Sequence, residues 1–164
     1  MKRSVVCDTE TTGFHFKDGH RVIEIAAVEV IDGKVTGREF HVYINPERPV
    51  PPDSTMIHGL TDDFLADKPL FKEVLPEFLK FIEGAEFIAH NAGFDETFLN
   101  EEMMKAGSTK TLWEYVTKVV DTLDLSKRLY KTGKHSLDAL LDRHAIDRSA
   151  REIHGALIDS QLLA

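Results

Sequence analysis

Two carboxylates separated by a single residue, Asp8 and Glu10, are the strongest chemical signal in the sequence. An apolar run precedes them and a turn-forming Thr-Thr-Gly segment follows, a pattern that predicts a buried strand ending in a turn. Alternate side chains of a strand share one face, so the two carboxylates are expected on the same face, roughly 6.6 Å apart. Two anions this close at a buried strand end repel each other, and a divalent cation between them removes the repulsion. The pattern therefore predicts metal-assisted chemistry.

A second group of polar residues follows the short apolar run Phe87-Ile88-Ala89. Asn91 and the nearby glycine suit a tight turn from strand to helix, which places Asp95 in the first helical turn. Taken alone, an acid at this position stabilises a helix N-terminus by roughly 0.3–1 kcal/mol and needs no catalytic role.

A third group, His154 and Asp159, lies near the end of the sequence. Five helical residues rotate by about 140°, so these two side chains cannot share one face of a regular helix. They can meet at one point only if His154 precedes the helix that carries Asp159. Taken alone, such a histidine is typical of a surface or capping residue.

Length, charge and cysteine content limit the classes of protein and of metal site that the sequence allows. The chain has 164 residues, enough for one domain with a substantial core, and a net charge of −8, which argues against a basic surface that coats duplex nucleic acid. It has one cysteine, Cys7, which alternates with Asp8 and is expected to pack in the core, so disulfides within the chain and cysteine-based zinc sites are excluded. We find no apolar stretch long enough to span a membrane and expect a cytoplasmic protein.

The pattern of apolar residues predicts a mixed α/β sheet flanked by helices. Three antiparallel strands are expected first, the last two over residues 21–31 and 35–44, and then an extended proline-rich loop over 45–54. Two further short strands, at 87–89 and 116–120, alternate with helices. The helices are expected around Phe71–Ile82, with Pro76 indicating a late start or a kink, around Phe94–Met103, and over 122–130, 136–144 and from 155 onward.

Each group of residues is weak evidence alone, but together and in this order they resemble the DEDDh subgroup of the DnaQ-like 3′–5′ exonucleases. Asp8 and Glu10 match the first motif of that family, Asp95 the second, and His154 with Asp159 the third. The resemblance covers essentially the whole chain. It is strongest to the epsilon-type proofreading subunits of bacterial DNA polymerase III, through the strings DTETTG, HGLTDDFLADKP, HNAGFD, SLDALLDRHAID and HGALIDSQLLA.

The resemblance implies an RNase H-like fold, with a mixed five-stranded sheet in which three antiparallel strands are followed by parallel additions. It also implies removal of nucleotides from a DNA 3′ end as 5′-monophosphates. It implies two Mg²⁺ or Mn²⁺ ions held by the four carboxylates, with Asp8 bridging both, Asp95 on the outer side and His154 as the general base. Oxygen ligands alone do favour such hard cations over zinc. The residues expected to bind substrate are Glu10, Thr11, Thr12, Ile57, His58, Asn91 and Phe94.

Two alternatives remain open from the sequence. One is an exonuclease of the RNase T or oligoribonuclease type, acting on RNA ends; the other is an inactive nucleic-acid-binding module on the same fold. The resemblance also implies partners, namely a single-stranded or frayed DNA end, the polymerase alpha subunit, a small theta-type subunit and the sliding clamp. We expect residues 1–164 to form a single exonuclease domain that lacks the polymerase-tethering tail of the epsilon-type subunits.

Overall fold

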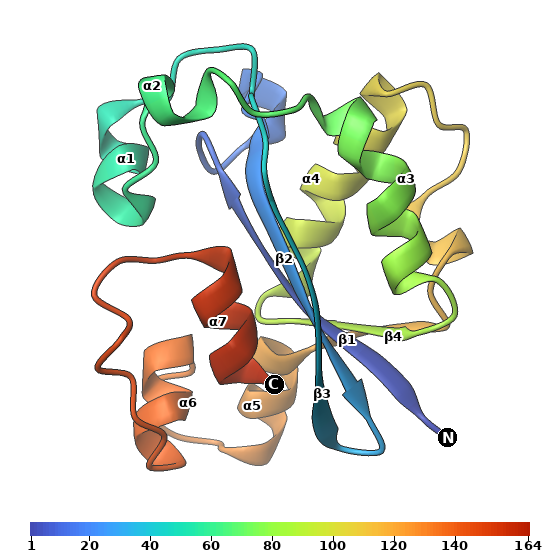
Figure 1. The fold of residues 1–164 in the computed structure, drawn as a ribbon. Coiled ribbons are helices and arrows are strands. Elements are labelled where there is room, and N and C mark those ends of the chain that lie inside the picture. Colours follow the sequence, from blue (N-terminus) through green and yellow to red (C-terminus); the bar gives the residue numbers. More distant parts are fainter.

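A mixed five-stranded sheet forms the centre of the computed structural model, which describes residues 1–164 (Figure 1). Its strands lie in the order β3-β2-β1-β4-β5. The first three strands are antiparallel, and β4 and β5 add to β1 in parallel, which confirms the predicted topology. The strand bounds are β1 (Arg3–Thr11), β2 (Val22–Ile31), β3 (Lys34–Tyr43), β4 (Glu86–Ala89) and β5 (Lys118–Asp121).

Helices cover both faces of the sheet (Figure 1). One face packs against α3 and α4, whereas α7 lies against β1 and β2 on the other face, beside α5 and α6. The short helices α1 and α2 lie near the end of β1. The helix bounds are α1 (Pro52–His58), α2 (Asp62–Leu65), α3 (Phe71–Ile82), α4 (Ala92–Lys105), α5 (Thr122–Leu129), α6 (Leu137–Arg143) and α7 (Ala156–Leu163), with 3₁₀ turns at Phe16–Asp18 and Leu112–Glu114.

The main core lies between the sheet and the pair α3 and α4. Cys7 is fully buried in it, as predicted, together with Phe78 of α3 and Phe98 of α4. Strand β2 is buried along almost its whole length because helices cover it on both sides. Burial on both faces explains why its sequence is apolar with little alternation, apart from the buried Glu24 and Glu29.

Two predicted boundaries differ from the structure. The segment expected to be an extended loop up to residue 54 becomes helical at Pro52, because proline is well tolerated in the first helical turn, where its missing N–H would have no partner. The fifth strand begins at Lys118 and not at Val116. Pro76 does not delay the start of its helix, since α3 begins at Phe71 and runs through Pro76 to Ile82.

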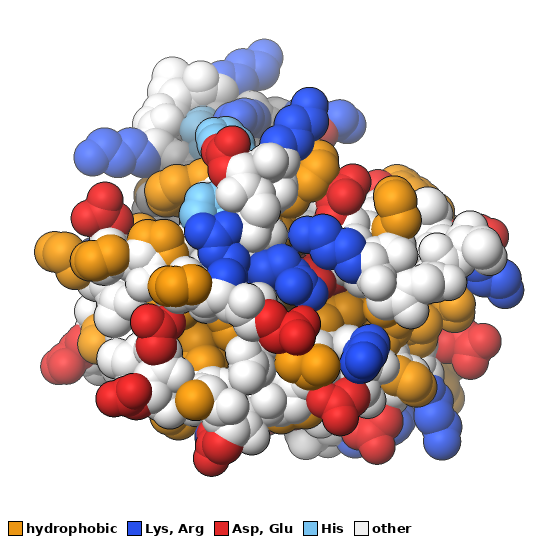
Figure 2. Space-filling model, turned by 90° about the horizontal axis from the view of Figure 1, so that it is seen from above, with side chains coloured by type: hydrophobic (Ala, Val, Ile, Leu, Met, Phe, Trp, Pro, Cys, Tyr) orange, Lys and Arg blue, Asp and Glu red, His pale blue; other side chains and the backbone are white.

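None of the helices combines the length and apolar character that crossing a membrane requires. The face seen from above in Figure 2 carries Lys and Arg side chains gathered near its middle, with Asp and Glu side chains mostly around them. Side chains of both signs are therefore present on this face.

Candidate active site

Strand β1 carries the first two carboxylates. In its pairing with β2, Asp8 is opposite Ala26 and Glu10 is opposite Glu24, which places both side chains on the face covered by α7. The register shifts directly after Glu10. Irregularities of this kind occur often beside active sites because they re-aim the side chains that follow.

Asp95 reaches the same site from the other face of the sheet. It lies in the first turn of α4, and its Oδ1 accepts a 2.6 Å hydrogen bond from the buried hydroxyl of Thr9, which alternates with Asp8 and Glu10 on β1. The turn before α4 has the expected tight geometry, with Asn91 in the left-handed conformation at φ 68°. The carboxylate of Asp121 fixes this turn by accepting from the Asn91 amide at 3.0 Å.

The third motif confirms the predicted geometry. Helix α7 begins at Ala156, so His154 lies in the segment before the helix and Asp159 lies in its first turn. The His154 amide donates to the carbonyl of Ile57 at 3.1 Å, which ties this segment to α1. Asp159 is buried, whereas half of the His154 side chain is exposed.

A cavity of about 410 Å³ unites these residues. All the residues predicted from the sequence line it, except Thr12. Five further residues line it that sequence reasoning did not select, namely Thr9, Gly13, Phe14, Ser54 and His90. The five catalytic candidates, which are far apart in the sequence, thus meet in one place.

Thr12 lies outside this cavity because its backbone groups have partners within the protein. Its amide donates to the Arg21 carbonyl, and its own carbonyl accepts from the Ser54 hydroxyl at 2.8 Å. His58 does line the cavity: its Nδ1 accepts from the Leu60 amide, and its buried Nε2 has no partner.

The ring of His90 is held by two contacts outside the carboxylate cluster. Its Nε2 lies 2.8 Å from the carbonyl of His135 and its Nδ1 lies 2.9 Å from the hydroxyl of Thr122. These contacts attach the cavity wall to the start of α5, through Thr122, and to the loop between α5 and α6, through His135.

Burial and mutual repulsion disfavour the charged forms of the carboxylates in the cavity. Burial, and then the neighbouring Glu24, Asp159 and Asp95, raise the pKa of Glu10 to about 8. Burial raises the pKa of Asp95 to about 7 against the hydrogen bond from Thr9, and burial with the neighbouring carboxylates raises the pKa of Asp8 well above its ordinary value. Buried acids whose charged forms are disfavoured in this way are typical of functional sites.

The residues of the cavity fit a divalent cation. Ligand atoms of Glu10, His154 and Asp159 lie within 4.8 Å of one another. Asp8 and Asp95 line the same cavity but lie outside that tightest group. A cluster of carboxylate oxygens is the donor set that hard cations prefer, and a cation would relieve the repulsion that raises these pKa values.

Sequence reasoning did not select Arg151, the positive side chain at this site. Its guanidinium is buried and contacts both oxygens of Asp159, with Nε at 2.5 Å from Oδ1 and Nη2 at 2.9 Å from Oδ2. Its sequence position, eight residues before Asp159 in a segment with several other charged residues, gave no signal of this contact.

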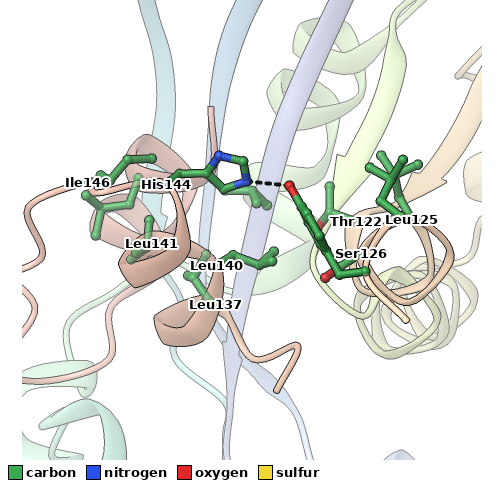
Figure 3. A pocket seen from close by; sticks show the side chains of 12 residues that line it. Thr122, Leu125, Ser126, Leu137, Leu140, Leu141, His144 and Ile146 are labelled. Atoms are coloured by element: carbon green, nitrogen blue, oxygen red, sulfur yellow. Dashed lines mark hydrogen bonds between the residues drawn. The ribbon is translucent and has the colours of Figure 1, made fainter. Parts of the chain in front are cut away.

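A second cavity, of about 250 Å³, lies among α5, α6 and α7 and has a different character (Figure 3). Leucines form most of its lining, and the one hydrogen bond across it joins the Tyr130 hydroxyl to Nε2 of His144. With no carboxylate in its lining, it offers none of the chemistry of the first cavity.

Comparison with known proteins agrees with this geometry. A family model described as exonuclease matches residues 5–164. The DNA polymerase III subunit epsilon of Pasteurella multocida is 47% identical over 167 residues, which cover 99% of this chain and 65% of that protein. The subunit of the same name from Rickettsia prowazekii is 45% identical over 162 residues, which cover 99% of this chain and 71% of that protein. The chain thus spans about two thirds of the length of these relatives.

Solved structures share the fold. Exonuclease X in complex with 5′ overhanging duplex DNA is 27% identical, with a TM-score of 0.67 over 99% of this chain and 89% of that one. The Escherichia coli ExoI–ssDNA complex is 18% identical, with a TM-score of 0.82 over 99% of this chain and 39% of that one. The expected RNase H-like arrangement is thereby confirmed, and the chain belongs to the exonuclease family.

Proposed function

We propose that this protein removes nucleotides one at a time from the 3′ end of single-stranded or mismatched DNA, as the proofreading exonuclease of a replicative polymerase. The observation that carries the proposal is the meeting of four carboxylates and one partly exposed histidine in a single cavity. The relatives named DNA polymerase III subunit epsilon support DNA as the substrate and replication as the context.

In this proposal Asp8, Glu10, Asp95 and Asp159 would hold two Mg²⁺ or Mn²⁺ ions. When bound, such ions stabilise both the attacking and the leaving oxygen of a phosphodiester displacement. Two of the carboxylates are held in place by the protein. The Thr9 hydroxyl orients Asp95, and Asp159 is positioned by its place in the first turn of α7.

His154 would accept a proton from the attacking water. Its side chain is half exposed and lines the cavity, so it can approach both solvent and a bound strand. The hydrogen bond of its amide to Ile57 limits how far the segment can move. General-base assistance of this kind typically contributes about 10²–10⁴-fold.

The rest of the cavity would hold the terminal nucleotide. Ile57 and Phe94 offer apolar surface for a base, and Thr11, His58 and Asn91 offer polar groups around it. Thr12 would act only indirectly, through the carbonyl that holds Ser54.

We also propose that residues 1–164 form one exonuclease domain of a cytoplasmic replication enzyme. Its partners would be the polymerase alpha subunit, a theta-type subunit and the sliding clamp. The naming of the relatives as subunits of DNA polymerase III supports this assignment.

The test is degradation of a 5′-labelled single-stranded DNA and of an RNA of the same sequence, each with Mg²⁺ or Mn²⁺. We expect a ladder that shortens from the 3′ end of the DNA and releases 5′-mononucleotides. Faster degradation of the RNA would favour the exoribonuclease alternative. Cleavage of closed circular DNA, or no cleavage of either strand, would contradict the proposal.

Two variants separate the proposed roles. Binding of Mn²⁺ at 100 times its dissociation constant stabilises the folded protein by about 2.7 kcal/mol, which raises the melting temperature. The Asp8→Asn variant should lose activity together with most of this rise. The His154→Ala variant should lose about 10²–10⁴-fold in turnover and keep the melting shift. Near-normal turnover of the alanine variant at saturating metal would exclude His154 as the base.

A further inference from the structure

Arg151 is a resident cation that contacts one carboxylate of the cavity, Asp159. Besides its two bonds to Asp159, its Nη1 lies 2.7 Å from Oδ1 of Asp138, and its Nη2 lies 3.0 Å from Nδ1 of His154. Only 6% of its side chain is exposed. The guanidinium therefore contacts two members of the group Glu10, His154 and Asp159, whose ligand atoms lie within 4.8 Å of one another.

The contact with His154 determines which nitrogen of the ring is available. A guanidinium can only donate, so Nδ1 of His154 must accept, and a neutral ring then carries its proton on Nε2. The lone pair that a general base needs is engaged by Arg151 in this arrangement. His154 can take a proton only after Arg151 has left Nδ1.

The contact with Asp159 has a matching consequence for a metal ion. Both carboxylate oxygens accept charge-assisted hydrogen bonds from one planar fork, which is the strongest common geometry for such a pair. A divalent cation that uses these oxygens meets a positive charge already in contact with them, so the two compete.

We propose that Arg151 is a latch on the carboxylate site: a divalent cation that binds the carboxylates displaces its guanidinium from Asp159 and, in the same movement, frees Nδ1 of His154. Asp138 holds the displaced side chain, because it bonds Nη1 and not the Nε and Nη2 atoms that contact Asp159. This inference rests on the proposed function, since it assigns a movement to the same metal site.

Metal binding measured by calorimetry tests the latch without any nuclease assay. In the Arg151→Gln variant the competing charge is gone, so Mg²⁺ or Mn²⁺ should bind about tenfold more tightly, as expected when a charge-assisted pair no longer has to open. The matched control is Arg148→Gln, which removes a neighbouring guanidinium that bonds Asp138 and Asp142 but not Asp159. The control should leave the metal affinity unchanged. An unchanged or weaker affinity in Arg151→Gln would overturn the latch.

A measurement on the wild-type protein covers the case in which Arg151→Gln does not fold. The Nε–H of Arg151 should give a protected NMR signal in the metal-free protein, because it is buried against Asp159. Titration with Mg²⁺ should shift or remove this signal with the same midpoint as metal binding, whereas a purely structural arginine would keep it and overturn the proposal. Wild-type protein that neither binds metal nor degrades DNA would instead contradict the proposed function.

Discussion

At the scale of single residues, the buried carboxylate of Glu10 makes the stability of the protein depend on pH. The raised pKa of Glu10, about 8 against an ordinary value of 4.5, means that the folded protein holds this proton more tightly than the unfolded chain does. The contribution of this carboxyl group to the free energy of unfolding is fully present below about pH 4.5. It is lost as the pH rises through about 8. The metal-free protein should therefore become less stable between pH 5 and pH 8, by at most about 1.4 kcal/mol per pH unit for one proton.

Chemical denaturation in a chelating buffer at several pH values measures this slope. The Glu10→Gln variant, which cannot ionise, should show a shallower decline than the wild type. Saturating Mn²⁺ should remove the decline, because metal and protons compete for the same oxygens. Equal slopes for wild type and variant would contradict the raised pKa of Glu10.

Thr9 gives a second prediction at this scale. Its hydroxyl donates to Asp95 at 2.6 Å inside the protein, so Thr9→Val removes the donor with little change of shape. Loss of a group that orients a metal ligand typically costs about 10–100-fold in metal affinity. Thr9→Ser keeps the hydroxyl and serves as the control. Calorimetric titration with Mn²⁺ should give similar affinities for the wild type and Thr9→Ser, and a much weaker affinity for Thr9→Val.

The residues that the sequence predicted and those that it missed differ in a physical way. Asp8, Asp95 and Asp159 could be selected because each lies where a strand or helix begins or ends, and such positions can be read from local periodicity. Thr9 and Arg151 reach the site only through contacts made by tertiary packing. Glu24 carried an overlooked signal, since a carboxylate in the middle of a continuous apolar strand is buried and must have partners.

At the scale of the elements, the positions of the five strands and the antiparallel pairing of the first three followed from the sequence, because turns and apolar runs are local signals. The helices α1 and α2 did not, because they are short and lie in or beside a proline-rich segment that resembles a loop. These two helices matter for function, since α1 carries Ile57 and His58 to the cavity and holds His154 through a backbone hydrogen bond.

Pro76 provides a test of element stability. It is exposed in the middle of α3, where it cannot donate the backbone hydrogen bond that the carbonyl of Lys72 would otherwise accept. Pro76→Ala restores that bond, and after allowance for the greater freedom of the unfolded chain we expect about 1–2 kcal/mol of added stability. Urea denaturation should show a higher midpoint. The exposed Lys80→Ala of the same helix should stay within about 0.5 kcal/mol of the wild type.

The whole molecule combines an acidic net charge with a cavity lined mainly by polar residues. Among its 164 residues, 28 are Asp or Glu and 20 are Lys or Arg, and on the face shown in Figure 2 Asp and Glu side chains lie among the Lys and Arg side chains. Duplex DNA binds proteins largely through neutralisation of its phosphates by such residues. We therefore expect weak contact with the duplex and recognition chiefly of a strand end that enters the cavity.

This charge distribution predicts a preference for frayed ends. A 3′ terminal nucleotide must leave its partner before it can reach Asp8 and His154, and a mismatched nucleotide spends less free energy on unpairing than a matched one, by a few kcal/mol at most. Removal of a mismatched terminal nucleotide should therefore be faster than removal of a paired one, while a fully single-stranded end of the same sequence should be cut at least as fast as the mismatch. Single-turnover rates on the three substrates at one salt concentration measure the order. Equal rates on matched and mismatched ends would mean that unpairing does not limit the reaction and that the protein opens the duplex by contacts of its own.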